Sequence, residues 1–367
     1  MMKKILCVVG TRPEAIKMAP VIHRLRKEPW AQVRVLATAQ HRHMLDQVLK
    51  VFDIEPDIDL DIMRPNQALI TLTARLLLDL DDVLQSEQPD VVLVQGDTTT
   101  VMSVALAAFY HRIPIGHVEA GLRTGDMSNP FPEEMNRVVA GHLAKWHFAP
   151  TESSRQNLLR EGLPDSRIWV TGNTVIDALK LVAEREKDLG VELDDSKRLI
   201  LVTSHRRENF GEPFREICRA IRDLADRNGD VQVLYPVHPN PNVKDIAHKI
   251  LGGHPRIVLC DPLDYLPFVG AMQRAHLILS DSGGVQEEAP ALGKPVLVLR
   301  RETERPEAVD AGVVKLVGPD YERIVTEAQR LLDDIDAYRE MARGISPYGD
   351  GQASERIAKV LREYFGF

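Results

Sequence analysis

The sequence predicts an α/β protein made of two doubly wound, Rossmann-type domains that face each other across a cleft. At 367 residues the chain is too long for one ordinary hydrophobic core. Short runs rich in β-branched residues alternate with longer amphipathic segments, which is typical of βα units on a parallel sheet. The first series ends with a helix at 175–187 and an acidic, apolar-poor stretch at 192–197, after which a second series begins, so we expect two such sheets.

The first series contains continuous apolar runs, as expected of strands buried on both faces. The predicted strands span 5–9, 33–37, 91–95, 115–119 and 147–149. The predicted helices between and after them span 15–27, 44–52, 70–84, 99–110, 133–145 and 153–161. A strand at 168–171 then leads into Gly172 and a helix at 175–187.

The second series shows the same alternation of strands and helices and defines the second domain. Its predicted strands span 199–203, 231–235, 257–260, 277–279, 296–299 and 313–317, with helices such as 214–227 and 321–333. We place the boundary near Gly172, which gives an N-terminal domain at 1–172 and a C-terminal domain at 173–352. A last helix, at about 353–367, is expected by fold analogy to pack back on the first domain.

Composition narrows the function classes. A net charge of -8 argues against a nucleic-acid binder, because such domains are usually basic. Cys7, Cys218 and Cys260 are far apart, which suits buried thiols in a reducing compartment and predicts neither a redox motif nor a metal site. The segment 41–43 has two histidines but no carboxylate at metal spacing, so we assign no metal. No run approaches membrane-spanning length and none reads as a signal peptide, so we expect a cytoplasmic protein.

The segment 277–290 is the strongest candidate for ligand binding. An apolar run ends in Asp281 and is followed by Ser282, Gly283 and Gly284, and then by a good helix opening. A turn of this kind binds anions, because unpaired N–H groups of a first helical turn point at the ligand. Glu288 lies one turn further on, within reach of a ribose hydroxyl. A nucleotide diphosphate is therefore one interpretation, and a simple tight turn is an equal alternative.

In the first domain, charged residues follow the predicted strands. Arg12 and Lys17 lie near a helix start after the first strand, where they suit a diphosphate or simply a solvated helix opening. The glycine patterns of dinucleotide- and ATP-binding proteins are absent from this position. Asp97 follows the strand at 91–95, Glu119 ends the strand at 115–119, and Glu133 opens a helix.

Each of these three carboxylates has a structural alternative. Asp97 could cap a helix and Glu133 could interact with the helix dipole, whereas Glu119 has less structural reason to be there. Together they favour acid and base work in one cleft.

Two histidines follow strands of the second domain. His205 comes after the strand at 199–203, and His238 comes after the strand at 231–235. Imidazole titrates near neutrality, so small perturbations change its charge. We favour a functional role for His205, while His238 could equally be a polar side chain at the strand end.

The order of the motifs resembles a known family along nearly the whole chain. The motifs are GTRPEAIK, QGDTTT, GHVEAGLRTG, PFPEEMNR, SHRREN, YPVHPNP, SDSGGVQEEAP and ERPEAVDAG. They resemble the non-hydrolysing UDP-N-acetylglucosamine 2-epimerases. The resemblance implies the two-domain GT-B fold, a cytoplasmic homodimer, and an isomerase that needs no cofactor. It also implies interconversion of UDP-N-acetylglucosamine (UDP-GlcNAc) and UDP-N-acetylmannosamine (UDP-ManNAc) for bacterial cell-surface polysaccharides.

The resemblance further implies a mechanism and catalytic residues. UDP leaves C1 as the C2 proton is removed, giving 2-acetamidoglucal, and both then return with the proton on the opposite face. Asp97, Glu119 and Glu133 match the carboxylates of the proton transfers, and His205 matches the residue that supports the leaving UDP. The resemblance does not tell us which carboxylate acts on which face.

Substrate-binding residues carry over by motif in the same way. Those implied are Arg12, Lys17, Leu263, Phe268, Ser282, Gly283, Gly284, Glu288 and Arg305. For Phe268, which matches the uracil pocket, core packing is the alternative.

Some members of the family have a second UDP-GlcNAc site, which Gln40, Glu133, Arg206 and His238 match here. His43 and Asn66 depart from that pattern, and an Asn cannot replace a bidentate guanidinium.

Three other functions remain open. A retaining GT-B glycosyltransferase would share the fold and the nucleotide sugar, but it gives no reason for several carboxylates and a histidine around C2. A hydrolysing epimerase would release UDP and N-acetylmannosamine (ManNAc). A nucleotide-sugar sensor would gain little from gathering carboxylates near an anionic ligand.

Overall fold

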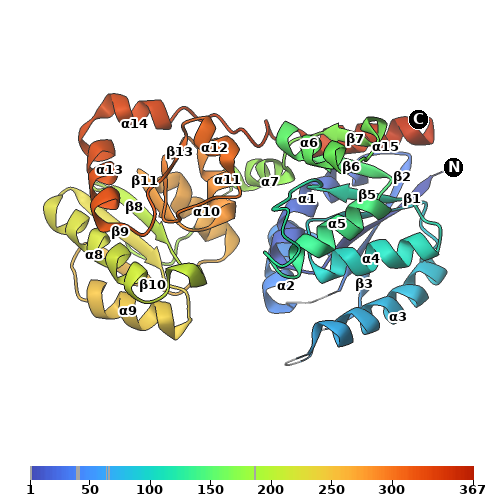
Figure 1. The fold of residues 1–367 in the computed structure, drawn as a ribbon, viewed down its shortest axis with the longest axis horizontal. Coiled ribbons are helices and arrows are strands. Elements are labelled where there is room, and N and C mark those ends of the chain that lie inside the picture. The colour runs from blue at the N-terminus through green and yellow to red at the C-terminus, as the bar shows by residue number, and fades with distance from the viewer. Residues whose placement is uncertain (1, 39–41, 63, 65–66, 186) are drawn as a thin grey trace. The chain divides into compact units, whose positions relative to one another are not determined.

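The structure is a computed structural model of the chain, and it describes all residues except 1, 39–41, 63, 65–66 and 186. The chain divides into two compact units. Unit 1 comprises Met1–Leu181 and Tyr348–Phe367, and unit 2 comprises Val182–Pro347. The division falls within helix α7 (Thr174–Ala183). Each unit has its own parallel sheet, which confirms the predicted α/β class with two Rossmann-like sheets (Figure 1).

Unit 1 contains a seven-stranded parallel sheet in the order β3-β2-β1-β4-β5-β6-β7. Its strands are β1 (Lys3–Val9), β2 (Ala31–Ala37), β3 (Ile58–Asp59), β4 (Val91–Gln95), β5 (Ile115–Val118), β6 (Trp146–Ala149) and β7 (Ile168–Val170). Its helices, besides α7, are α1 (Arg12–Arg26), α2 (Arg42–Val51), α3 (Leu69–Glu87), α4 (Thr99–Tyr110), α5 (Glu133–Leu143), α6 (Glu152–Arg160), η1 (Asp165–Arg167) and α15 (Ala353–Phe365). The two-residue strand β3 was not predicted, because it is too short for a periodic signal.

Unit 2 contains a six-stranded parallel sheet in the order β10-β9-β8-β11-β12-β13. Its strands are β8 (Arg198–Thr203), β9 (Val231–Pro236), β10 (Ile257–Cys260), β11 (Leu277–Ser280), β12 (Val296–Val298) and β13 (Val314–Leu316). Its helices are η2 (Arg207–Asn209), α8 (Glu212–Arg227), α9 (Pro241–Leu251), α10 (Tyr265–Arg274), α11 (Gly283–Ala291), α12 (Pro306–Asp310), α13 (Tyr321–Asp333) and α14 (Ile335–Met341).

Burial explains why the strand sequences are so apolar. The central strands β1, β4, β8 and β11 are almost entirely buried, since helices cover both faces of each sheet (Figure 1). In unit 1, α3, α4 and α5 pack in succession on one another, while α1 packs on α2 and α15. In unit 2, α8 packs between α9 and α13.

The last helix belongs to unit 1. The Asp177 carboxylate, on α7, accepts hydrogen bonds from the backbone of Ala353 (3.1 Å) and of Ser354 (2.8 Å) at the start of α15. The ring of Trp30 lies 5.7 Å from that of Phe367. These contacts fix both ends of the helix.

The strand orders also locate the ligand edges. In doubly wound sheets, ligands bind beyond the carboxyl ends of the strands where the strand order reverses. That switch point lies between β1 and β4 in unit 1 and between β8 and β11 in unit 2. Among the described residues, no helix is both long and apolar enough to span a bilayer.

Candidate active site

The turn after β1 is organised by a buried carboxyl group, that of Glu14. Its Oε2 accepts hydrogen bonds from the backbone N–H of Gly10 (2.5 Å) and Thr11 (2.8 Å), and its Oε1 accepts one from the Thr98 hydroxyl (2.5 Å). Burial raises the pKa of Glu14 to about 7, against the effect of these hydrogen bonds. Because Thr98 is the N-cap residue of α4, Glu14 ties together the turns that follow β1 and β4, on either side of the switch point. The i, i+3 spacing of Thr11 and Glu14, typical of a capping box, was the sequence signal for it.

The turn after β1 has room only for a glycine at position 10. A Cβ at Gly10 would lie 2.6 Å from the Thr38 hydroxyl and 2.8 Å from that of Thr100. Arg12 is the first residue of α1, just beyond the carboxyl end of β1, and is half-buried.

Glu119 follows β5 and is held on both carboxylate oxygens. Its backbone adopts the left-handed conformation, with φ of 62°. Oε1 accepts hydrogen bonds from Lys17 Nζ (2.5 Å) and Asn173 Nδ2 (3.0 Å), and Oε2 accepts one from the Gln95 amide. Two residues predicted separately, Lys17 and Glu119, thus form one buried ion pair.

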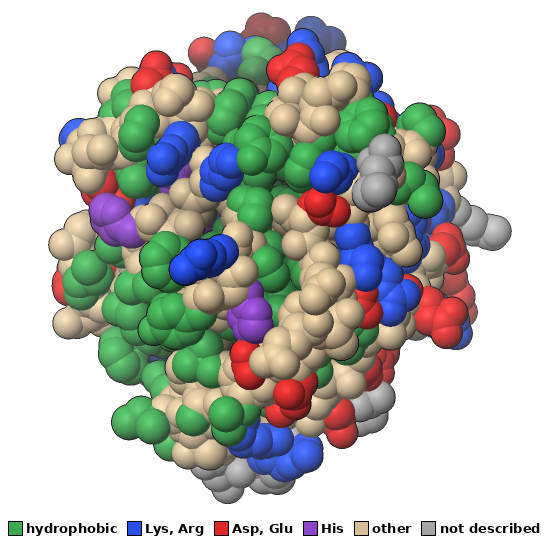
Figure 2. Space-filling view, turned by 90° about the vertical axis from the view of Figure 1, so that its right-hand side faces the viewer, with side chains coloured by type: hydrophobic (Ala, Val, Ile, Leu, Met, Phe, Trp, Pro, Cys, Tyr) green, Lys and Arg blue, Asp and Glu red, His purple; other side chains and the backbone are tan. Residues whose placement is uncertain are grey.

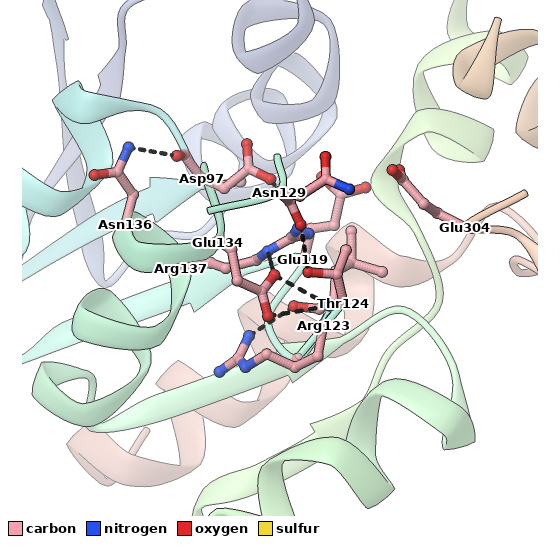
Figure 3. Close-up of polar contacts among 12 residues, drawn as sticks. Asp97, Glu119, Arg123, Thr124, Asn129, Glu134, Asn136, Arg137 and Glu304 are labelled. Atoms are coloured by element: carbon pink, nitrogen blue, oxygen red, sulfur yellow. Dashed lines mark hydrogen bonds and ion pairs between the residues drawn. The ribbon is translucent and has the colours of Figure 1, made fainter. Parts of the chain in front are cut away.

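Asp97 follows β4, and its side chain is 32% exposed. Its Oδ2 lies 3.5 Å from Arg137 Nη1, and its backbone carbonyl accepts a hydrogen bond from Asn136 Nδ2 (2.9 Å) (Figure 3). Burial raises the pKa of Asp97 to about 6, and the charges of Glu119 and Glu133 add to this while Arg137 and Lys17 oppose it. A carboxyl group with this pKa can both take up and release a proton near neutrality.

The start of α5 brings two adjacent carboxylates to the same edge. Glu133 is half-buried in the first turn of α5 and acts on Asp97 through its charge. Glu134 is buried and accepts hydrogen bonds from the backbone N–H of Thr124 (3.0 Å) and Gly125 (2.9 Å) and from Arg137 Nε (2.7 Å) (Figure 3). Sequence reasoning selected Glu133 and did not single out Glu134 or Arg137; their i, i+3 spacing on one helix was the available signal.

Unit 2 contains a corresponding edge, which is organised by Asp281. This fully buried residue directly follows β11, and its Oδ2 accepts hydrogen bonds from four donors. They are the Ser204 hydroxyl (2.9 Å), the backbone N–H groups of His205 (2.9 Å) and Arg206 (2.9 Å), and Asn209 Nδ2 (3.1 Å). Sequence reasoning treated Asp281 only as the end of an apolar run and missed this role.

His205 lies beside this carboxylate. Its Nδ1 is 3.6 Å from Asp281 Oδ1, and its ring stacks on that of His238 with centroids 5.5 Å apart. Burial lowers the pKa of His205, while the Asp281 charge opposes that shift. The structure therefore brings the two predicted histidines together and gives His205 a carboxylate neighbour.

The predicted phosphate turn opens helix α11. Ser282 is the N-cap residue, and Gly283 and Gly284 form the first turn. A Cβ at Gly283 would lie 3.2 Å from Arg305 Cζ, so a side chain there would press on this guanidinium and displace it by a few tenths of an ångström. Arg305 Nε and Nη2 both lie 2.9 Å from Glu287 Oε1. Ser282, Gly283, Gly284 and Arg305 thus gather at one helix N-terminus, which is the local geometry of an anion site.

The remaining predicted binding residues lie nearby or outside the described part. Glu288 is buried and accepts a hydrogen bond from the Tyr265 hydroxyl (3.3 Å). Leu263 and Phe268 are half-buried, and Phe268 lies on α10 with Tyr265. Of the predicted second-site residues, the Arg206 and His238 side chains are exposed.

Two positions used in the second-site argument, Gln40 and Asn66, lie outside the described residues, and so does the His43 side chain. In the part of the chain that the structure describes, no cluster of three or more His, Cys, Asp or Glu residues could hold a metal ion.

Comparison with known proteins first defines the class of the fold. A glycosyltransferase of kitacinnamycin has the same fold with a TM-score of 0.67 at 11% identity, and 99% of each chain is covered. The two-sheet architecture is therefore that of GT-B glycosyltransferases.

Closer relatives define the family. A sequence model described as UDP-N-acetylglucosamine 2-epimerase matches residues 23–362. The UDP-N-acetylglucosamine 2-epimerase of Escherichia coli K12 is 58% identical, covering 98% of both chains. A solved UDP-GlcNAc 2-epimerase of Neisseria meningitidis, bound to UDP-GlcNAc, is 49% identical with a TM-score of 0.90, covering 98% of this chain and 100% of that one. The chain belongs to the UDP-N-acetylglucosamine 2-epimerase family.

Proposed function

We propose that this protein is a non-hydrolysing UDP-GlcNAc 2-epimerase, which interconverts UDP-GlcNAc and UDP-ManNAc. The observation that carries the proposal is the carboxylate cluster of unit 1, in which Asp97 has a pKa of about 6 and lies near Glu119 and Glu133. Inversion at C2 needs a group that removes a proton and a group that returns one to the other face. The 58% identity to the Escherichia coli enzyme and the nucleotide sugar bound by the Neisseria meningitidis enzyme support the same substrate here.

The proposed reaction needs no redox step. A carboxylate of the cluster takes the C2 proton, the C2–H electron pair forms the C1–C2 double bond, and the C1–O bond breaks with its electrons going to UDP. The bound 2-acetamidoglucal then takes back UDP at C1 and a proton on the opposite face of C2. Asp97, Glu119 and Glu133 are the proposed proton-transfer residues, and atoms and electrons balance without a cofactor.

Unit 2 is the proposed UDP-binding unit. His205 and the N-terminus of α11, with Ser282, Gly283 and Gly284, would stabilise the charge that develops on the departing diphosphate. Arg305 adds a cation at this turn, Glu288 would accept a hydrogen bond from the ribose, and Leu263 and Phe268 would line the uracil pocket. Arg12 and Lys17 are the proposed cationic contacts of unit 1.

We also propose that the protein is a cytoplasmic homodimer that supplies UDP-ManNAc for cell-surface polysaccharide. Support for a dimer comes from exposed apolar side chains on α3 and at the end of α4, including Ile70 (84% exposed), Leu78 (70%) and Tyr110 (71%). Hydrophobic side chains gather over part of the unit 1 face seen in Figure 2. Such surface commonly marks an interface. A sedimentation mass equal to one chain would contradict the dimer.

Proton NMR of the protein with UDP-GlcNAc in deuterated water, without nicotinamide, tests the reaction. We expect deuterium at C2 and accumulation of a manno isomer still attached to UDP. Free ManNAc with stoichiometric UDP would instead identify a hydrolysing epimerase. Tight UDP binding without exchange would overturn the proposal in favour of a transferase or a sensor.

A further inference from the structure

Arg137 is a buried cation that no motif argument selected. It lies on α5, where only 6% of the residue is exposed. Its Nε donates to Glu134 Oε2 (2.7 Å), and its Nη1 lies 3.5 Å from Asp97 Oδ2 (Figure 3). One guanidinium therefore lies between a carboxylate that faces a loop and a carboxylate proposed to move protons.

Glu134 fixes the position of this guanidinium. Its two oxygens also accept the backbone N–H groups of Thr124 and Gly125, so the carboxylate is anchored to the loop after β5. With Glu134 anchored, the hydrogen bond to Nε sets where the rest of the Arg137 side chain lies. The 2.7 Å hydrogen bond to Glu134 thus holds the Arg137 guanidinium beside Asp97, with Nη1 3.5 Å from Asp97 Oδ2.

The charges around Asp97 show why this position matters. From α5 it faces Arg137 and Glu133, from the end of β5 Glu119, and from α1 Lys17 and Glu14. Of the two cations, Lys17 is bonded to Glu119, and Arg137 has the stronger influence on Asp97. Burial and the charges of Glu119 and Glu133 push Asp97 toward its protonated form, and Arg137 is the main force in the other direction.

A purely structural role does not account for Arg137. Its Nη2 is buried and has no hydrogen-bond partner among the described residues. A buried polar group without a partner lowers stability, and a buried ion pair is often no more stable than an apolar replacement. Packing and the pair with Glu134 therefore leave part of this guanidinium unexplained, whereas its Nη1 lies 3.5 Å from the Asp97 carboxylate.

We propose that Arg137 is a positioning residue, held by Glu134, whose charge keeps Asp97 able to release and take back a proton near neutral pH. This inference rests on the proposed epimerase function, because it assigns Arg137 a part in the proton transfer at C2. Arg137 acts through Asp97 and need not touch the substrate.

The test compares wild type with R137Q, R137K and R123M. R137Q removes the charge but keeps an amide that can donate to Glu134, and R137K keeps the charge. R123M removes another buried guanidinium of unit 1, which pairs with Glu161 and is not among the charges that act on Asp97. Circular dichroism and thermal melting establish that each variant folds, and R137M replaces R137Q if the latter does not.

Two readouts are measured between pH 5 and 9. The first is the pH profile of C2 epimerisation. The second is the carboxyl infrared band of the unliganded protein, with the band of Asp97 assigned by its loss in D97N. Removing a cation raises the pKa of a neighbouring carboxyl group by about one to three units. In R137Q we expect the pKa of Asp97 to rise by at least about one unit, which is a tenfold change in proton affinity. The rise should be visible both in the infrared titration of Asp97 and in the part of the pH–rate profile that depends on this group. R137K should move them less, and R123M should leave them in place.

The outcomes separate the inference from the function. If R137Q lowers turnover equally at all pH values and the Asp97 titration does not move, the inference is wrong. If R123M moves the titration as much as R137Q does, the effect is not specific and the inference is also wrong. If wild type shows no C2 exchange, the proposed function fails, and the infrared titration alone then decides whether Arg137 sets the proton affinity of Asp97.

Discussion

Asp97 in unit 1 and Asp281 in unit 2 occupy equivalent places in their sheets but have opposite surroundings. Each follows the strand that lies across the switch point from the first strand of its sheet, β4 beside β1 and β11 beside β8. Asp281 is fully buried and accepts four hydrogen bonds on one oxygen. Asp97 is 32% exposed, and its carboxylate faces Arg137 at 3.5 Å.

This difference shows that position in the fold does not decide what a carboxylate does. The donors around Asp281 come mainly from the loop after β8, so its carboxylate holds that loop, and His205 with it, against β11. The group around Asp97 consists of charges, and burial brings its pKa to about 6. One edge holds its aspartate with hydrogen bonds, and the other surrounds its aspartate with charges, as the proposed proton transfer at Asp97 requires.

The largest effect is expected for Asp281→Ala. The substitution leaves four buried donors without their acceptor, at about 1–3 kcal/mol each, so unit 2 should lose about 5 kcal/mol of stability. The free energy of unfolding from urea denaturation, read with a fluorescent or circular dichroism probe, checks this. Asp281→Asn is the matched control, because its amide oxygen can replace Oδ2. A loss below about 1 kcal/mol for the alanine variant would contradict the scaffold role.

Asp97→Asn should affect activity rather than stability. The change keeps the shape and removes the titrating group, so we expect turnover to fall by roughly 10³-fold, equal to about 4 kcal/mol in the barrier. The fold should not lose stability at neutral pH, because the raised pKa of Asp97 means that its ionisation costs stability and the neutral Asn does not carry that cost. Steady-state rates of UDP-ManNAc formation measure turnover, urea denaturation measures stability, and calorimetric UDP affinity shows whether the nucleotide still binds. Full activity with normal UDP binding would remove Asp97 from the proposed proton-transfer group.

Much of the fold could be predicted from the sequence, because most strands have a local sequence pattern. Strands such as β4 and β8 are continuous apolar runs, and their buried pattern can be read without tertiary information. β3 has two residues and owes its place to pairing with β2, which no local pattern encodes. The exact end of α7 was also missed, since it ends at Ala183 rather than at residue 187.

For the site, the sequence indicated which strand ends carry chemistry but not which side chains meet there. Motifs selected Lys17 and Glu119, and only the fold, which brings together residues 102 apart, shows that they pair. Asp281 was missed because a single aspartate after an apolar run is usually a turn residue. Arg137 was missed because its effect depends on the distance to Asp97 across two elements. The catalytic and binding assignments stay predictions until variants are measured.

Glu14 shares features with both aspartates. Like Asp281 it is buried and accepts several hydrogen bonds, yet its pKa is raised, from 4.5 to about 7. The folded state therefore binds the Glu14 proton more tightly than the unfolded state does. The resulting stabilisation is fully present below about pH 4.5 and is lost as the pH rises through about 7.

Glu14→Gln removes this titration while keeping an acceptor for Gly10 and Thr11. Relative to wild type, the variant should gain about 3 kcal/mol of stability between pH 4.5 and pH 8, the equivalent of the shift in pKa. Free energies of unfolding measured at both pH values check this, and their difference between the two proteins cancels every group that the substitution leaves alone. If the free energy of unfolding changes equally in wild type and variant between the two pH values, the pKa of Glu14 is not raised in the folded state. The hydrogen bonds from Gly10, Thr11 and Thr98 would then outweigh the burial of the Glu14 carboxyl group.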